Sequence, residues 1–187
     1  MTVSCSKETI EKPNIVLIVA DDLGWSDLSY MGSTYYETPN IDKLSKSGMI
    51  FYNGYASAAN CAPSRATMLS GKYQNAHGIY SVVNPFLGYG SDRGSRKTRK
   101  LIPIKTKSNL DLDFFVIPEM LKDLGYVNGH FGKWHLGDIG FHPENSGFDI
   151  NIGGNKHGGP GGYFSPYKYT NMDDGPKGEY LTDRIGD

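Results

Sequence analysis

The feature that most constrains the fold is a run of apolar, largely β-branched residues at 14–20, followed directly by Asp21 and Asp22. Such a run is typical of a strand buried on both faces, as in parallel α/β sheets. Ligands of these sheets bind at the carboxyl ends of the strands, where the two aspartates fall. Because adjacent carboxylates repel one another, a hard divalent cation is the simplest means of keeping both ionised. A loop with a helix-capping aspartate is the alternative.

A second stretch, residues 61–71, predicts a short helix that begins at Cys61. Pro63 suits the first turn of a helix, and Gly71 suits the left-handed residue just past its end. Cys61 would then lie where free N–H groups and the helix dipole favour an anion, with Arg65 one turn further along nearly the same face. A lone cysteine is more commonly a small buried apolar residue, so its position alone leaves both interpretations open.

Helix and strand signals alternate along much of the rest of the chain. Residues 38–48 predict a helix, and with strands at 14–20 and 49–52 it would complete a βαβ unit. Residues 118–125 predict another helix, and residues 126–131 predict the strand that follows it. We therefore expect an α/β fold with a mainly parallel sheet flanked by helices.

Two residues that suit an anionic substrate follow this last predicted strand. Lys133 and His135 alternate along an extended segment, so both side chains can point into the same cleft. A lysine there can bind an anion, and a histidine can transfer a proton. Taken singly, each would more commonly be a surface residue or a core histidine.

Five motifs together resemble those of one enzyme family in both sequence and order. They read Asp-Asp, Thr-Pro-Asn-Ile-Asp-x-Leu, Cys-x-Pro-x-Arg, Gly-Lys-Tyr and Gly-Lys-Trp-His-Leu-Gly, and lie at 21–22, 38–44, 61–65, 71–73 and 132–137. They resemble the type I, formylglycine-dependent sulfatases of the alkaline phosphatase superfamily. The resemblance implies an alkaline phosphatase-like α/β fold and hydrolysis of a sulfate ester.

The resemblance also implies the catalytic groups. Cys61 would be converted to Cα-formylglycine by a maturation enzyme, and the hydrated aldehyde would be the nucleophile. Arg65 would stabilise that hydrate, Lys72 would hydrogen-bond it, and His135 would contact its hydroxyl. Lys133 would bind the sulfate of the substrate. His77, near the Gly-Lys-Tyr motif, is expected to be peripheral.

The same resemblance implies a metal site. Its ligands in this chain would be Asp21, Asp22 and the modified Cys61. Calcium suits a crowded set of protein oxygen ligands, and magnesium is the alternative.

The sequence predicts an N-terminal tail at 1–12 and the N-terminal portion of a sulfatase catalytic domain at 13–187. Full sulfatases are longer and carry further metal ligands and a second catalytic histidine, so we expect this portion alone to be inactive. Cys5 after small residues resembles the end of a lipoprotein signal. A lipidated Cys5 would attach the protein to a membrane at the periplasm or cell surface of a bacterium. An irregular tail with an incidental cysteine is the alternative.

The sequence also bears on the partners. A net charge of −1 gives no global field that favours nucleic acid, and no run approaches the roughly 18 apolar residues of a membrane span. A basic stretch at 93–107 and a loop at 153–167 rich in glycine and aromatics suit a sulfated carbohydrate substrate. Solvated loops are the alternative for both, including for His157 in the second.

Three other functions compete with that of a carbohydrate sulfatase. A phosphomonoesterase or phosphodiesterase of the same superfamily would use serine, threonine or unmodified cysteine as its nucleophile. An enzyme of another class could reuse the fold after losing the metal site. A non-catalytic glycan-binding module would keep Cys61 as a thiol. The Cys-x-Pro-x-Arg maturation signal favours the sulfatase.

Overall fold

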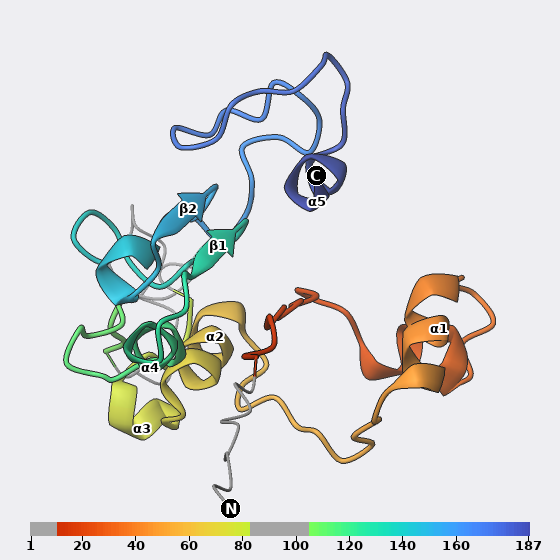
Figure 1. Ribbon diagram of the computed structural model, residues 1–187, viewed down its shortest axis with the longest axis horizontal. Helices are drawn as coiled ribbons and strands as arrows, with labels where there is room; N and C mark the ends of the chain where they lie inside the picture. The colour runs from red at the N-terminus through yellow and green to blue at the C-terminus, as the bar shows by residue number, and fades with distance from the viewer. Residues whose placement is uncertain (1–10, 83–104) are drawn as a thin grey trace, which may run out of the picture. The chain divides into compact units, whose positions relative to one another are not determined.

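The computed structural model describes residues 11–82 and 105–187. By its internal contacts the chain divides into two compact units, unit 1 at Met1–Ile50 and unit 2 at Phe51–Asp187, and we consider each by itself. The described elements of unit 1 are η1 (Trp25–Asp27), η2 (Ser29–Met31) and α1 (Pro39–Ser47). Those of unit 2 are α2 (Cys61–Ser70), α3 (Gln74–His77), α4 (Ile117–Asp123), β1 (Gly129–Phe131), η4 (Pro143–Ser146), β2 (Ile150–Ile152) and α5 (Leu181–Gly186) (Figure 1).

Helix α1 of unit 1 is fastened to η2 by the polar residues of its own motif. Thr38 Oγ1 donates to Asp42 Oδ1 at 2.9 Å, and the Tyr30 N–H donates to the same oxygen at 3.2 Å. Ser29 and Thr38 each donate a backbone N–H to the hydroxyl of the other, both at 2.9 Å. The predicted helix at 38–48 is therefore confirmed, and Thr38 and Asp42, four residues apart, hold its first turn.

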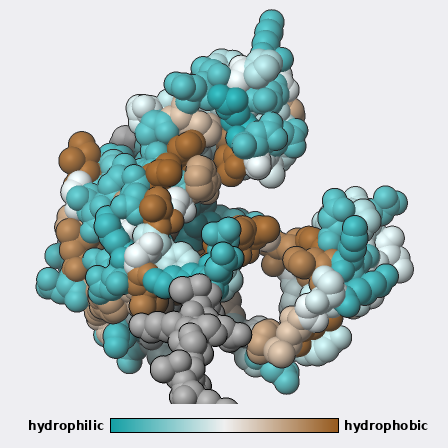
Figure 2. Space-filling view, viewed as in Figure 1, coloured by the Kyte–Doolittle hydropathy of each residue, from teal (hydrophilic) through white to brown (hydrophobic). Residues whose placement is uncertain are grey.

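Two predicted strands are not formed in the described part of the chain. Neither 14–20 nor 49–52 is a strand, so the predicted βαβ unit is wrong for this structure. The apolar pattern supplies strand propensity, but a strand persists only where a neighbour takes up its backbone N–H and C=O groups. Figure 2 shows hydrophobic side chains on the surface, and Val16 and Ile18 belong to the exposed set at 83% and 82%.

Unit 2 contains a parallel strand pair of the kind that the sequence predicts. β1 pairs with β2 in parallel, with Gly129 opposite Ile150 and Phe131 opposite Ile152 (Figure 1). The predicted strand at 126–131 is thus confirmed over its last three residues.

Helices α2 and α4 confirm two further predictions. Helix α2 ends where Gly71 adopts φ +66° and donates its N–H to Thr67 O at 2.8 Å. At the start of α4, Glu119 accepts the Val116 N–H at 3.0 Å through its carboxylate and so satisfies a helix-end donor. No helix among residues 11–82 and 105–187 combines the length and apolarity needed to cross a membrane.

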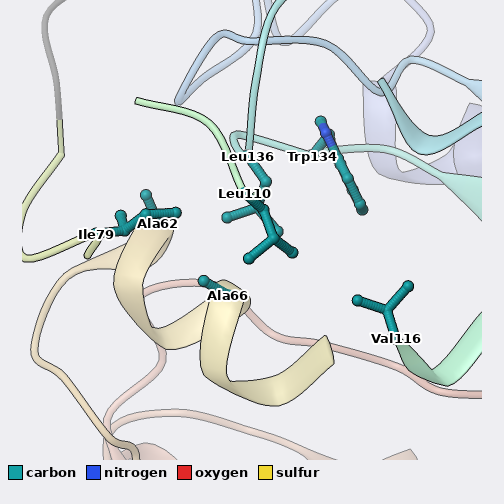
Figure 3. Close-up of a cluster of buried hydrophobic side chains, with 7 residues drawn as sticks. All are labelled: Ala62, Ala66, Ile79, Leu110, Val116, Trp134 and Leu136. Atoms are coloured by element: carbon teal, nitrogen blue, oxygen red, sulfur yellow. The ribbon is translucent and has the colours of Figure 1, made fainter. Parts of the chain in front are cut away.

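A small apolar core joins α2 to the segment that follows β1 (Figure 3). Its side chains come from α2, from the loops around 79 and 110, from the residue before α4 and from the segment after β1. They are Ala62, Ala66, Ile79, Leu110, Val116, Trp134 and Leu136. The small alanines let the helix approach closely. This core therefore holds together the two elements that carry the Cys-x-Pro-x-Arg and Lys-x-His motifs.

Candidate active site

Cys61 is the first residue of helix α2, as the sequence predicts. The preceding residue, Asn60, is extended, and Pro63 lies in the first turn, where its missing N–H costs no hydrogen bond. Cys61 is a half-buried free thiol, while its neighbour Ala62 enters the core at 5% exposure. The helix thus buries one face and leaves the thiol partly accessible at its positive end, which suits an oxygen nucleophile or anion.

Arg65 connects α2 to the second motif. It lies one turn after Cys61, and its Nη1 donates to the backbone carbonyl of Lys133 at 2.6 Å. A charged donor to a carbonyl is among the stronger hydrogen bonds in proteins. Two motifs 68 residues apart in sequence are therefore joined by a direct bond.

Lys133 and His135 lie on the side of their segment that faces away from the core. Trp134 and Leu136 are buried at 1% and 0% exposure, whereas Lys133 and His135 are half-buried. The Trp134 indole donates to Phe141 O at 2.8 Å, which fixes the segment further. Alternate residues are buried as the sequence predicts, but the segment is not extended throughout, because His135 has a left-handed backbone with φ +61°.

The loop at 153–167, which the sequence predicts to suit a carbohydrate substrate, packs along the same segment. Asn155 O accepts the His135 N–H at 2.9 Å. Lys156 Nζ lies 2.6 Å from Asp138 Oδ2, and this ion pair holds the pKa of Asp138 below its ordinary value. The loop is thus attached at His135 and again three residues later. The high glycine content of this loop is the feature of the sequence that indicates close packing of its backbone.

His130 on β1 is a half-buried histidine on the segment that leads to the site, and sequence reasoning did not single it out. Its ring packs edge-on against Trp134 and Phe148, with centroids 5.3 and 5.2 Å apart. Its Nε2 lies 3.2 Å from Gly132 O and donates to it. Burial lowers its pKa to about 4; the hydrogen bond to Gly132 opposes this shift, and the positive charge of Arg65 adds a smaller lowering. At neutral pH it is therefore an uncharged support for the segment that carries Lys133 and His135.

Two residues beyond α2 differ in burial. Lys72 is exposed directly after the helix-ending Gly71. His77 is fully buried: its Nδ1 accepts the Ile79 N–H at 3.1 Å, and its Nε2 lies 3.2 Å from Thr67 Oγ1. Because Nδ1 accepts, the neutral ring carries its proton on Nε2, and burial lowers its pKa accordingly. His77 is a structural histidine.

Asp21 and Asp22 occupy a turn of unit 1 and are exposed. Asp22 has φ +61°, a left-handed conformation that aspartate adopts more readily than most residues. As a donor set, two carboxylates suit a hard cation such as calcium. These two predicted ligands belong to unit 1 and Cys61 belongs to unit 2, so the metal site itself stays a prediction.

Other parts of the predicted substrate region are less informative. Most of the basic stretch at 93–107 lies outside the described residues, and His157 is exposed. A shallow hollow of about 480 Å³ lies beside α4, and none of the predicted site residues lines it. It is lined by Leu112, Asp113, Phe115, Glu119, Lys122, Asp123 and Gly147.

Comparison with known proteins identifies the family. The sulfatase family model matches residues 13–185, and the chain belongs to this family. It is 36% identical over 158 residues to N-acetylgalactosamine-6-sulfatase of Canis lupus familiaris, which covers 84% of this chain and 27% of that protein. It is 39% identical over 157 residues to a sulfatase of Formosa agariphila, covering 78% of this chain and 27% of the relative. The chain thus spans about a quarter of the length of these relatives.

Solved structures agree on the fold. The chain matches the crystal structure of Ps i-CgsB with a TM-score of 0.68 and 31% identity, over 92% of this chain and 39% of that one. The same protein in complex with k-i-k-neocarrahexaose matches equally well. The predicted sulfatase-like α/β fold is therefore confirmed for this part of the domain.

Proposed function

We propose that the protein containing this chain is a sulfuric ester hydrolase that removes sulfate from a carbohydrate, using a formylglycine made from Cys61. The observation that carries this proposal is the bond from Arg65 to the Lys133 carbonyl. It joins the maturation motif on α2 to the Lys-x-His motif, as a single catalytic centre requires.

The chemistry that the modified cysteine would supply is that of an aldehyde hydrate. One of its hydroxyls attacks sulfur and the other later expels sulfate, which a serine could not do. Overall, one water is consumed and the S–O bond breaks, giving an alcohol and sulfate. Conversion needs a formylglycine-generating enzyme able to reach Cys61, and the half-buried thiol at the first position of α2 is compatible with that access.

The proposed metal ion is calcium, with magnesium as the alternative. Asp21, Asp22 and the modified Cys61 would hold it, and when bound it would neutralise negative charge on the sulfate and the nucleophile. The donor chemistry fits, because carboxylate oxygens are preferred by hard cations.

The other side chains have roles that follow from their charge and position. Arg65 stabilises negative charge beside residue 61, while its bond to Lys133 O keeps the two motifs in register. Lys133 binds a sulfate oxygen, and Lys72 donates to the nucleophile. His135 accepts or returns a proton at the hydroxyl of residue 61.

A carbohydrate is the proposed substrate class. Tyr163 and Phe164 are 59% and 60% exposed in the loop at 153–167, where aromatic faces suit the apolar faces of sugar rings. Tyr169, just after this loop, lies within electrostatic reach of both Tyr163 of the loop and Lys133, which supports a role for the aromatic loop beside the proposed sulfate-binding lysine. One relative is a sulfatase of N-acetylgalactosamine 6-sulfate by name, and one structural neighbour was solved with a neocarrahexaose.

The decisive experiment is a mass measurement on the peptide that contains residue 61. The complete protein would be produced in a host that makes formylglycine. We expect a peptide lighter than the thiol form, because the CH₂–SH group becomes an aldehyde. The Cys61→Ala variant is the control and should lack both the shift and activity. An intact thiol in a protein that still hydrolyses esters would reject the mechanism.

The same preparations separate the competing functions. We expect release of sulfate from sulfated mono- or oligosaccharides with a higher kcat/KM than from an aryl sulfate. Phosphate release from phosphate esters at a higher kcat/KM would favour the phosphatase, and saccharide binding without turnover would favour the glycan-binding module.

We also propose that the protein acts at the periplasm or cell surface of a bacterium, attached through a lipidated Cys5. The support is the sequence around Cys5 alone, which lies outside the described residues. Labelling with a fatty-acid analogue should mark the wild type and not Cys5→Ser, and equal labelling of both would reject the anchor.

A further inference from the structure

The glycine-rich loop beside His135 is built to a fixed position. It follows β2 directly, and Asn151 in the middle of that strand makes two hydrogen bonds to the Gly154 backbone. Its Nδ2 donates to Gly154 O at 3.0 Å, and its Oδ1 accepts the Gly154 N–H at 2.9 Å. The Asn171 amide donates to the same carbonyl at 3.2 Å. The start of the loop is therefore held from two directions, by β2 and by the segment around 171.

The same loop is attached at His135 and again at Asp138, three residues later. Asn155 O accepts the His135 N–H at 2.9 Å, and Lys156 pairs with Asp138 at 2.6 Å. His135 itself has φ +61°, in the left-handed region that few non-glycine residues occupy. The His135 backbone is thus held by its own conformation and by the hydrogen bond to Asn155. A steric overlap with the imidazole ring would therefore rotate the side chain about its χ angles and leave the backbone in place.

Gly158 lies against that imidazole. A Cβ added at Gly158 would be 2.6 Å from Cε1, 3.0 Å from Nε2 and 3.1 Å from Nδ1 of His135. These three atoms form the edge of the ring that contains both nitrogens and the carbon between them. A methyl group there would overlap the part of the histidine that carries and transfers protons, because separations under about 3.4 Å are inside van der Waals contact.

We propose that Gly158 is a positioning residue of this centre: lacking a side chain, it lets the loop pack against the N–C–N edge of His135 and so sets the orientation of the imidazole. The proposal rests on the proposed function for its kinetic consequence, but its geometric content does not. Gly158 acts through His135 and needs no contact with substrate.

The chain offers a matched control in the next residue. A Cβ at Gly159 would meet no atom within 4 Å, and neither glycine has a backbone φ in the left-handed range. Gly158→Ala and Gly159→Ala therefore make the same chemical change in the same loop, and only the first creates an overlap with His135.

The kinetic test uses the complete, formylglycine-loaded protein. We expect Gly158→Ala to lower kcat by about 10-fold to 100-fold with KM little changed, since small displacements of a catalytic group cost rates of this order. Gly159→Ala should remain near the wild type. In a His135→Ala background, adding Gly158→Ala should reduce kcat no further, because the group that it displaces is gone. Equal activity of the two alanine variants, or an unchanged penalty in the His135→Ala background, would overturn the proposal.

A second measurement keeps the inference separate from the assigned activity. The histidine Cε1–Hε1 signals of the complete protein can be observed by NMR, and the signal of His135 can be assigned by its loss in His135→Ala. The His135 signal should shift in Gly158→Ala and stay in place in Gly159→Ala, whether or not the protein is a sulfatase. An unmoved His135 signal would reject the positioning role, whereas a shift in a protein that hydrolyses no sulfate ester would reject only the proposed function.

Discussion

At the scale of single residues, Arg65 both makes a hydrogen bond of the proposed centre and affects the ionisation of His130. Arg65 donates to Lys133 O, and its positive charge adds to the larger effect of burial in disfavouring a charged His130. His130 is therefore uncharged at neutral pH, and its ring packs edge-on against Trp134 and Phe148. The proposed centre therefore has, close to Arg65, a histidine whose ionisation is suppressed.

This arrangement predicts acid sensitivity. The pKa of His130 is about 4 in the folded protein against an ordinary value of 6.5, so between these values the unfolded chain binds more protons. The histidine therefore contributes stability above about pH 6.5 that is lost as the pH falls through 4. The full difference corresponds to about 3 kcal/mol as an upper estimate. We expect the free energy of unfolding of His130→Gln to depend less on pH than that of the wild type between pH 7 and pH 4.5.

Denaturant titrations at several pH values would measure this difference, with the exposed His157→Gln as the control. His157→Gln should follow the wild-type slope. If His130→Gln also kept that slope, the acid sensitivity would arise elsewhere.

At the scale of elements, Gly147 at the end of η4 packs closely against the backbone of Glu119 at the start of α4. Gly147 ends η4 with φ +85°, and a Cβ there would lie 2.7 Å from the backbone nitrogen of Glu119. Backbone atoms of a helix cannot move aside cheaply. Close contact between the two elements therefore depends on glycine at this position, for conformation and for space alike.

Gly140 makes this testable, because it has nearly the same backbone angle, φ +86°, with no atom within 4 Å of an added Cβ. Gly140→Ala should cost about 1–2 kcal/mol, the penalty of a left-handed alanine. Gly147→Ala should cost about 1–3 kcal/mol more, from overpacking against α4. Thermal or denaturant unfolding of the two variants gives the difference directly. Equal losses would mean that α4 yields and that packing there is loose.

At the scale of the whole molecule, the proposed centre draws residues from distant parts of the sequence. The aspartates at 21–22, the helix at 61 and the motif at 133–135 are separated by about 40 to 110 positions of chain. The proposed catalysis therefore requires these distant segments to come together in the folded complete protein. Binding of the proposed calcium ion is a measure of whether they do.

We predict that Asp21→Asn weakens calcium binding and lowers activity in the complete protein, since a hard-cation site relies on carboxylate charge. In the wild type, calcium at 100 times its Kd should stabilise the fold by about 2.7 kcal/mol. Calorimetric titration and the shift of Tm with calcium would measure both effects. Asp173→Asn, at an exposed position, is the control. Full activity and an unchanged Tm in the presence of chelator would contradict the metal assignment.

The basic residues at 96–100 predict a dependence on substrate length. Replacing Arg96, Lys97, Arg99 and Lys100 with glutamine should reduce kcat/KM for a long sulfated polysaccharide more than for a monosaccharide. At high salt, the loss of kcat/KM on the polysaccharide should be smaller, because salt screens these charges. A control of equal charge change replaces the exposed Lys43, Lys46, Lys168 and Lys177. If chain length made no difference, the stretch would be a solvated loop.

The sequence by itself determined the local elements and the family. Pro63 with Gly71 delimits α2, Thr38 and Gly48 delimit α1, and the ordered motifs identify a sulfatase. These features are legible because caps, turns and catalytic motifs depend on residues close together in the chain. The alternation of Lys133 and His135 was predictable for the same reason.

Only the tertiary structure decided which residues meet. Arg65 reaching Lys133 O, the loop residues Asn155 and Gly158 against His135, and His130 against its aromatic neighbours join positions that no local pattern connects. The predicted strand at 14–20 is not formed, although its side chains suit a buried strand. A strand requires hydrogen bonds to a neighbouring strand, and a local sequence pattern does not show whether such a neighbour is present.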